Sequence, residues 1–232
     1  MDSDIKLVDA EPTFEPIKMR TPLKFGTGVI DSATSFNLKV TVESRAGQTA
    51  TGISNMLLSV VWGYPSQTVS FEAREQAMIE VSRRVCTLML DNARFGHPME
   101  LYLEAKGELQ GIADAVSSEM ALADSMPLLG ALVCASPVDA ALADGFGKAN
   151  SISTYDGYTA EFMSQDLSAW CGPDFAGKYP GDYLHKTFKP SLPIFHLCGP
   201  LGGVATVRGG GQQAERLLAA DAQRHGEPRR DQ

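Results

Sequence analysis

The sequence is poor in basic residues. Its 232 residues include 20 Lys and Arg against 28 Asp and Glu, which gives a formal net charge of −8. No basic cluster occurs before the last few residues. Nucleic acids and anionic membrane surfaces both attract proteins through clustered Lys and Arg. We therefore expect no nucleic-acid partner and no membrane partner.

The sequence also lacks the long apolar segments of membrane and secreted proteins. Its longest apolar stretch, residues 56–64, is interrupted by Ser59 and Gly63. A segment that spans a bilayer needs roughly 20 residues. The N-terminus carries Asp2 and Asp4 instead of the basic and apolar regions of a secretory signal peptide. These absences predict a cytoplasmic protein.

Cysteines are few and far apart. Cys86, Cys134, Cys171 and Cys198 form no Cys-x-x-Cys pair. Their even number would permit two disulfides, but nothing else in the sequence indicates secretion. We expect reduced thiols, most of them packed in the core as small hydrophobic residues.

Common catalytic motifs are missing as well. The sequence contains no Gly-x-Ser-x-Gly elbow and no His-Glu-x-x-His helix. Residues 145–148 look like part of a phosphate-binding loop, but Leu142 replaces its first glycine and Ala149 its Ser or Thr. The glycine run at residues 209–211 does not lie between a predicted strand and a predicted helix. Residues 145–147 are therefore predicted to end a helix.

The histidines have no evident catalytic partner. His97 falls at a predicted helix stop, His185 in a loop, His196 on an apolar run and His225 in the C-terminal tail. A single histidine on a buried strand is most often a core residue, whereas acid–base catalysis needs a partner within hydrogen-bond reach.

The carboxylates fit structural roles. Asp139 is predicted in the first turn of a helix, where the helix dipole stabilises a negative charge. Asp174 and Asp182 are predicted in ordinary turns. The sequence therefore contains no complete catalytic constellation and no metal site.

The first part of the chain has the pattern of β structure. Apolar and polar residues alternate strictly over residues 36–43, which predicts a half-buried strand. A turn follows, and residues 48–54 return as a weaker strand. Residues 4–19 are a third strand, which Pro12 and Pro16 place at a sheet edge or at a bulge. The prediction is a three-stranded antiparallel meander.

The next part has helical spacing. A helix is predicted from residue 66 to about residue 88, and residues 95–98 should stop it, with Gly96 at the C′ position. A second helix is predicted over residues 98–122, weakened by two glycines. Ser136 and Pro137 are typical of a helix start, as N-cap and first residue of a short third helix.

The C-terminal third is irregular in composition. Residues 150–190 are rich in glycine, proline and aromatic residues. This composition predicts an ordered, irregular connection, with one helix near residues 160–167. Residues 192–198 have the pattern of a short apolar strand. Residues 200–232 contain no lysine and are dominated by Gly, Ala, Arg and Gln, so we expect a loosely ordered tail.

Three stretches together resemble the N-terminal part of the enolase superfamily, in its mandelate racemase/muconate lactonizing branch. Residues 21–26 followed by 33–40 are similar to the family's early loop and second strand. Residues 47–53 are similar to its return strand. Residues 136–149 resemble the family's helix in which Ala-Leu-x-Asp precedes a Gly-Lys pair. The resemblance covers about residues 4–198.

The resemblance implies an α+β fold, in which a three-stranded meander and a helical bundle form a capping domain on a (β/α)-barrel. It implies an isomerase or lyase whose barrel binds Mg²⁺ and uses a Lys or His base to remove the proton α to a carboxylate. Loops of the capping domain would close over the small carboxylate substrate. Here those loops are residues 20–32 and 54–66, with Phe25, Trp62 and Tyr64 as candidate substrate-facing residues.

The sequence departs from that family where its catalytic residues should follow. Residues 192–198 would be the first barrel strand, but the tail comes next. No catalytic residue and no metal ligand is therefore carried over. We divide the chain into a capping domain (1–150), a crossover with at most the first barrel strand (151–199) and a low-complexity tail (200–232).

The leading hypothesis is a truncated superfamily protein, inactive alone, whose tail is read out of frame and whose exposed apolar surface favours self-association. Its parent would be a racemase, cycloisomerase or acid-sugar dehydratase. The alternative is a free-standing α+β binding module that uses the apolar loop around Trp62. A third hypothesis is a self-contained enzyme in which His185 or His196 meets a carboxylate.

Overall fold

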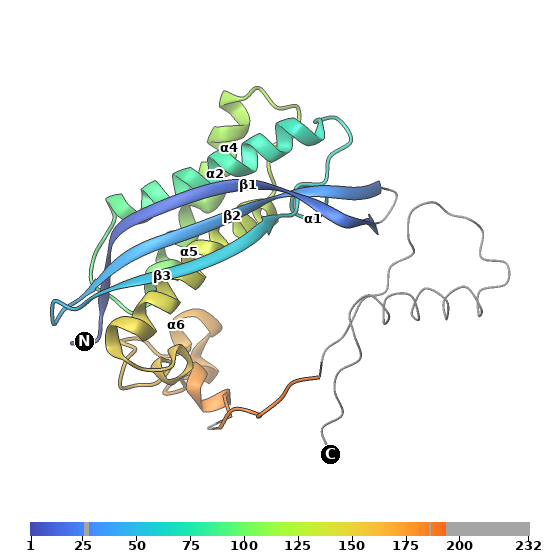
Figure 1. Cartoon of the computed structure of the whole chain (residues 1–232). Coiled ribbons are helices and arrows are strands. Elements are labelled where there is room, and N and C mark those ends of the chain that lie inside the picture. The colour runs from blue at the N-terminus through green and yellow to red at the C-terminus, as the bar shows by residue number, and fades with distance from the viewer. Residues whose placement is uncertain (26–27, 186, 194–232) are drawn as a thin grey trace, which may run out of the picture. The chain divides into compact units, whose positions relative to one another are not determined.

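The computed structural model describes residues 1–25, 28–185 and 187–193. Three strands come first and six helices follow, with short 3₁₀ turns among them (Figure 1). Their bounds are β1 Ile5–Phe25, β2 Gly28–Ser44, β3 Thr49–Leu58, α1 Val60–Gly63, α2 Phe71–Asp91, α3 Pro98–Ala105, α4 Leu109–Glu119, α5 Leu128–Asn150 and α6 Ser168–Cys171. The 3₁₀ turns are η1 Lys106–Glu108, η2 Thr154–Gly157, η3 Pro173–Phe175 and η4 Pro180–Tyr183.

The chain divides into two compact units. The larger contains Met1–Met19 and Ser32–Phe195, and therefore most of the sheet and every helix named above. The smaller contains Arg20–Asp31, which includes the end of β1 and the start of β2, together with His196–Gln232. The predicted α+β class, a meander followed by helices, is confirmed within the larger unit.

The sheet has the strand order β1-β2-β3. β2 and β3 are antiparallel, and their register runs from Thr34 opposite Leu58 to Glu43 opposite Thr49. The predicted alternation is confirmed, because every second side chain of β2 is buried: Phe36, Leu38, Val40 and Val42. β1, which contains Pro12, Pro16 and Pro22, lies at an edge of the sheet, the position in which strands tolerate proline.

One face of the sheet packs on α5, which crosses directly behind β3 (Figure 1). Glycines set the spacing of this contact. A Cβ on Gly52 would overlap the carbonyl oxygen of Ala141 and lie 2.8 Å from the nitrogen of Gly145. A Cβ on Gly145 would lie 2.9 Å from a methyl group of Val42. The strand and the helix therefore meet backbone to backbone, which only residues without a side chain permit.

The prediction that Ser136 and Pro137 begin a helix is wrong, and so is the predicted helix end at residues 145–147. Both segments lie inside the 23-residue helix α5, which begins at Leu128. Pro137 has no N–H for the carbonyl of Val133, and the Ser136 hydroxyl donates to that carbonyl instead (3.0 Å). The hydroxyl therefore satisfies the acceptor that the proline leaves open.

α5 is also the one helix among the described residues that is long and apolar enough to cross a membrane, with a mean hydropathy of 1.4. It is not the stretch that the sequence analysis tested for this property. More than half of it is buried inside the larger unit, against β3 and the helices α2, α3 and α4. Its apolar character is that of a core helix.

α2 confirms the first predicted helix but ends at Asp91, before the predicted stop at residues 95–98. The Ser70 hydroxyl accepts from the Ala73 N–H at its start, and Asn92 caps its end. Gly96 is therefore not the C′ residue. His97 instead caps the start of α3, since its Nδ1 accepts from the Met99 N–H. The single helix predicted over residues 98–122 is divided into α3 and α4 by the 3₁₀ turn η1.

The segment after α5 is ordered but irregular, as predicted. The helix predicted near residues 160–167 is absent from it, and short turns and α6 take its place. The buried carboxylate of Glu100 holds this segment, because it accepts from the Ser164 hydroxyl and the Gln165 N–H (both 2.8 Å). Asp166 accepts from the N–H groups of Ser168 and Gly177 (2.9 and 2.6 Å). Side-chain acceptors therefore replace helical hydrogen bonds here.

The strand predicted at residues 192–198 is tested only at its beginning. Leu192 and Pro193 have no regular structure, and residues 194–198 lie outside the described residues, as does the predicted tail.

Candidate functional site

The predicted capping loop of residues 54–66 is an ordered segment made of the end of β3, the short helix α1 and a turn. Trp62 lies in α1 and is 48% exposed, whereas Tyr64 is fully buried. The Tyr64 hydroxyl donates to the carbonyl of Asp124, and Arg74 Nη1 donates to the carbonyl of Tyr64 (2.8 Å). Trp62 is therefore free to contact a partner, while Tyr64 fixes the segment in place.

Asp124 fixes the same turn from the other side. Its carboxylate accepts from the hydroxyls of Ser66 and Thr68, both at 2.6 Å. These two hydrogen bonds lower the pKa of Asp124. The turn that follows Trp62 is therefore tied down at three points.

The other predicted capping loop, residues 20–32, is strand at both ends. β1 continues to Phe25 and β2 begins at Gly28. The Phe25 side chain lies outside the described part of the structure. Phe25 and Trp62 belong to different compact units, so the substrate-facing roles of Phe25, Trp62 and Tyr64 stay predictions.

The described histidines do not form a catalytic pair. His97 is 1% exposed and packs edge-on against the rings of Phe146 and Tyr158, with centroids 5.0 and 5.5 Å away. Burial lowers the pKa of His97 to about 4, against the opposing effect of the Glu100 carboxylate. His185 lies in an exposed loop, and His196 is outside the described residues. His97 is therefore a neutral structural residue at neutral pH.

The described residues form no cluster of metal ligands. Within residues 1–25, 28–185 and 187–193, no three His, Cys, Asp or Glu side chains lie close enough together to hold an ion. Mg²⁺ binds through one or two carboxylates that remain free to ligate, usually with phosphate or water oxygens. No step of a metal-dependent reaction can therefore be assigned to these residues.

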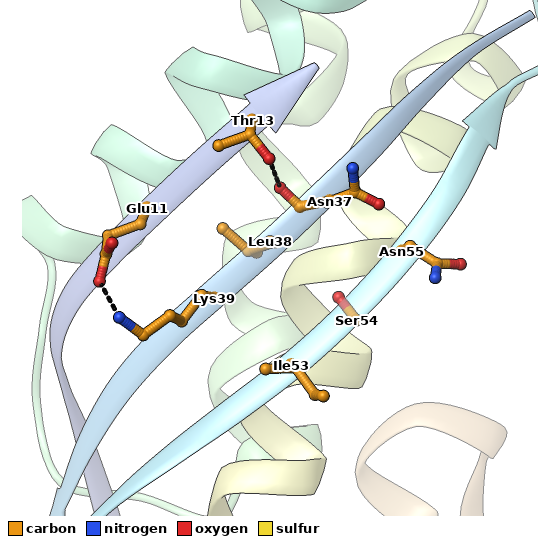
Figure 2. Close-up of a pocket in the computed structure, with 8 residues that line it drawn as sticks. All are labelled: Glu11, Thr13, Asn37, Leu38, Lys39, Ile53, Ser54 and Asn55. Carbon is orange, nitrogen blue, oxygen red and sulfur yellow. Dashed lines mark hydrogen bonds and ion pairs between the residues drawn. The ribbon is translucent and has the colours of Figure 1, made fainter. Parts of the chain in front are cut away.

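An open hollow of about 520 Å³ lies on the sheet face that the helices leave uncovered (Figure 2). Lys39 and Glu11 form an ion pair across it (2.6 Å), and the Thr13 hydroxyl donates to the carbonyl of Asn37 (3.5 Å). Ile53 is 61% exposed beside them. The charged groups of this hollow are already paired with one another, so it offers no free charge to a ligand.

A second hollow, of about 380 Å³, lies between α3, α5 and the irregular segment. No sequence pattern predicted this hollow, and the predicted position of Asp139 in the first turn of a helix is wrong. Asp139 lies in the middle of α5 rather than in a first turn, and it faces this hollow together with Tyr102 and Tyr158. These residues are up to 56 positions apart in the chain. The only local signal was the presence of Tyr155 and Tyr158 one turn apart.

Comparison with known proteins gives solved structures only, since no family model and no curated protein matches the chain. An enolase from alpha proteobacterium BAL199, with bound magnesium, has a TM-score of 0.42 and 14% identity and covers 63% of this chain. An enolase from Bradyrhizobium, complexed with magnesium and mandelic acid, has a TM-score of 0.38 and 18% identity and covers 69%. A dipeptide epimerase from Enterococcus faecalis V583, complexed with magnesium and L-Leu-L-Tyr, has a TM-score of 0.37 and 14% identity and covers 67%.

These three structures are enolase-superfamily proteins, the group that the sequence stretches resemble. The match covers 32%, 37% and 35% of their respective chains, so this chain spans about a third of their length. The magnesium, mandelic acid and dipeptide belong to those proteins.

Proposed function

We propose that this chain is the N-terminal portion of an enolase-superfamily protein of the mandelate racemase/muconate lactonizing branch. The parent would carry out Mg²⁺-dependent removal of the α-proton from a small carboxylate substrate, as a racemase, cycloisomerase or acid-sugar dehydratase. Residues 1–150 would be its capping domain. Residues 151–199 would be the crossover with at most the first barrel strand, and residues 200–232 the low-complexity tail. The chain alone would be inactive.

One observation of this molecule carries the proposal. Two of the stretches that resemble the superfamily, residues 47–53 and 136–149, pack directly on each other as β3 and α5. The Ile53 N–H donates to Asp144 Oδ2 (2.8 Å), and Lys148 Nζ donates to Asp144 Oδ2 (2.6 Å) and to the carbonyl of Thr51 (3.1 Å). The Asp and Lys of the resembling helix thus bind the free edge of the resembling strand.

This arrangement gives the motif a physical role. β3 is an edge strand, so alternate backbone groups have no partner strand. Asp144 and Lys148, one helical turn apart, supply an acceptor and a donor to two of those groups. The resemblance therefore rests on residues that hold the sheet to its helix, which is what a capping domain needs before it can position loops.

The capping role proper falls to Trp62 in this proposal. Trp62 is half-exposed on a turn that Tyr64 and Asp124 hold in place. The start of α5 lies close to α1. Leu128 and Leu129 are exposed there. The next residue, Gly130, has its Cα 3.4 Å from the position that a Cβ on Gly63, the neighbour of Trp62, would take. This apolar group would meet the barrel in the parent and would favour self-association in its absence.

The decisive experiment is to resequence the encoding DNA through codon 200 and beyond, and to translate all three frames. The proposal expects another frame to resume with a Lys-bearing strand followed by spaced strands that carry Asp and Glu. If no frame continues such a barrel, the proposal loses its main support.

A direct activity test complements the DNA sequence. The purified chain, incubated with Mg²⁺ and mandelate in D₂O, is expected to leave the α-proton unexchanged, because no cluster of metal ligands occurs among its described residues. Exchange above the enzyme-free rate would favour the self-contained enzyme instead.

The second candidate is a free-standing α+β binding module. The observation that favours it is the exposure of Trp62 on an otherwise fixed turn, because exposed tryptophans are common at the centre of interfaces. A monomeric chain whose Trp62 fluorescence responds to a small carboxylate would support this function over truncation.

A further inference from the structure

The pocket between α3, α5 and the irregular segment has an unusual lining. Three tyrosines, Tyr102, Tyr155 and Tyr158, surround a single carboxylate, Asp139, and Met99 completes one wall. Among the described residues, no Lys, Arg or His lines this pocket. The charge that these lining residues supply is therefore negative, and the rest of the lining is aromatic and aliphatic.

The carboxylate of Asp139 has no partner in the part of the chain that the structure describes. Among the described residues, no hydrogen bond and no ion pair reaches it. In the same part of the chain, every fully buried side-chain polar atom has a hydrogen bond. Its oxygens are therefore accessible from the pocket and not enclosed. Burial raises the pKa of Asp139, because removal from water disfavours the charged carboxylate.

The carboxylate and the phenol rings lie close together. The pKa values of Tyr102 and Tyr158 are raised by their burial and by the charge of Asp139. Tyr158 is fixed in place by His97, whose ring packs against it at 5.5 Å. Tyr155 is 59% exposed and contacts the ring of Phe188, with centroids 5.9 Å apart. The inner side of the pocket is therefore built from packed side chains, and Tyr155 lies at its exposed rim.

This chemistry selects for one class of ligand. The faces of tyrosine rings carry negative electrostatic potential and attract cations, most strongly those that shed water easily, such as alkylammonium groups. An unpaired carboxylate in the same pocket adds a counter-charge. To a divalent metal ion, the described lining residues offer a single carboxylate, which would leave most of the coordination to water.

We propose that this pocket binds a small organic cation, an alkylamine or quaternary ammonium group, with Asp139 as counter-ion and Tyr102, Tyr155 and Tyr158 as the cage. The volume of about 380 Å³ suits a ligand of choline size, near the lower end of small-molecule sites. This inference does not rest on the proposed function, because all of these groups lie in the larger unit of this chain.

Choline and its uncharged carbon isostere, 3,3-dimethylbutan-1-ol, separate charge from shape. We expect the full chain to bind choline saturably at millimolar concentration in calorimetry, and to bind the isostere at least tenfold more weakly. Equal binding of the two compounds, or no saturable binding of choline, would overturn the proposal.

Variants locate the site. Asp139→Asn should weaken choline binding at least tenfold, and Tyr102→Leu should weaken it several-fold, whereas Tyr102→Phe, which keeps the ring, should bind as the wild type does. Asp174→Asn, on an exposed turn outside the pocket, is the matched charge control and should change nothing. Circular dichroism confirms that each variant is folded. Wild-type affinity in folded Asp139→Asn would contradict the assignment.

Discussion

Two aspartates on different sides of α5 have different surroundings. Asp144, on the sheet side, accepts from the Ile53 N–H and pairs with Lys148. Asp139, on the side of the irregular segment, has no such partner among the described residues and faces an aromatic pocket. The two carboxylates are five residues apart on one helix. A carboxylate that completes a fold and one left available to a ligand can thus share one motif, and only their partners distinguish them.

The largest expected effect is on the sheet side. Gly52→Val should lower the free energy of unfolding by about 3 kcal/mol or more, at the upper end of overpacking costs, because its Cβ would overlap the carbonyl of Ala141. Urea unfolding measures this loss. Gly111→Ala in α4, where a Cβ meets open space, is the control and should stabilise by about 0.5–1 kcal/mol. An unchanged urea midpoint for Gly52→Val would show that β3 and α5 are not in close contact.

The next effect tests the other side of α5 through pH. The pKa of His97 is about 4 in the folded chain and near 6.5 when unfolded, so the unfolded chain binds the proton first as pH falls. The stability that neutral His97 contributes is complete above pH 6.5 and is lost as pH falls toward 4. The loss in the free energy of unfolding is about 3 kcal/mol at most. Unfolding free energies at a series of pH values measure it.

Two histidine variants isolate that contribution. His97→Asn keeps an N-cap acceptor but has no titrating ring, so its stability should vary less between pH 7 and pH 4 than that of the wild type. His185→Asn, in an exposed loop, should keep the wild-type slope. Identical slopes for all three proteins would mean that His97 is not buried.

A matched pair of substitutions compares the aspartates directly. Asp144→Ala should lower the free energy of unfolding by about 1 kcal/mol, because the Ile53 N–H and Lys148 lose their acceptor. Asp139→Ala should leave the stability at pH 7 unchanged or raise it. The raised pKa of Asp139 means that its charge costs stability above the ordinary carboxyl range, and the cost grows as pH rises through the folded pKa. Equal losses would refute the distinction between them.

The smallest effect concerns hydroxyl groups. Tyr64→Phe removes the donor to the Asp124 carbonyl and should cost about 1 kcal/mol. Tyr102→Phe removes a pocket hydroxyl that no hydrogen bond within the described residues engages, and should be close to neutral. Thermal unfolding of the two variants side by side gives the comparison.

Local patterns predicted some elements well. The alternation over residues 36–43 was sufficient for β2, because one face of that strand is buried and the other is wet. The apolar spacing of α2 was sufficient for the same reason. Pro137 misled the prediction, since a proline is rare inside a helix and common at its start. Its position in α5 is tolerated because the neighbouring Ser136 hydroxyl satisfies the open carbonyl.

By itself, the sequence determined the α+β class, the meander, the resembling stretches and the net negative charge. Those features depend on periodicity and composition, which are local. The tertiary structure alone decided that Tyr64 is an anchor while Trp62 is exposed, that α5 is continuous, and that Asp139 meets the tyrosines of two distant segments. Partners of this kind are set by packing between segments, and no spacing along the chain records them.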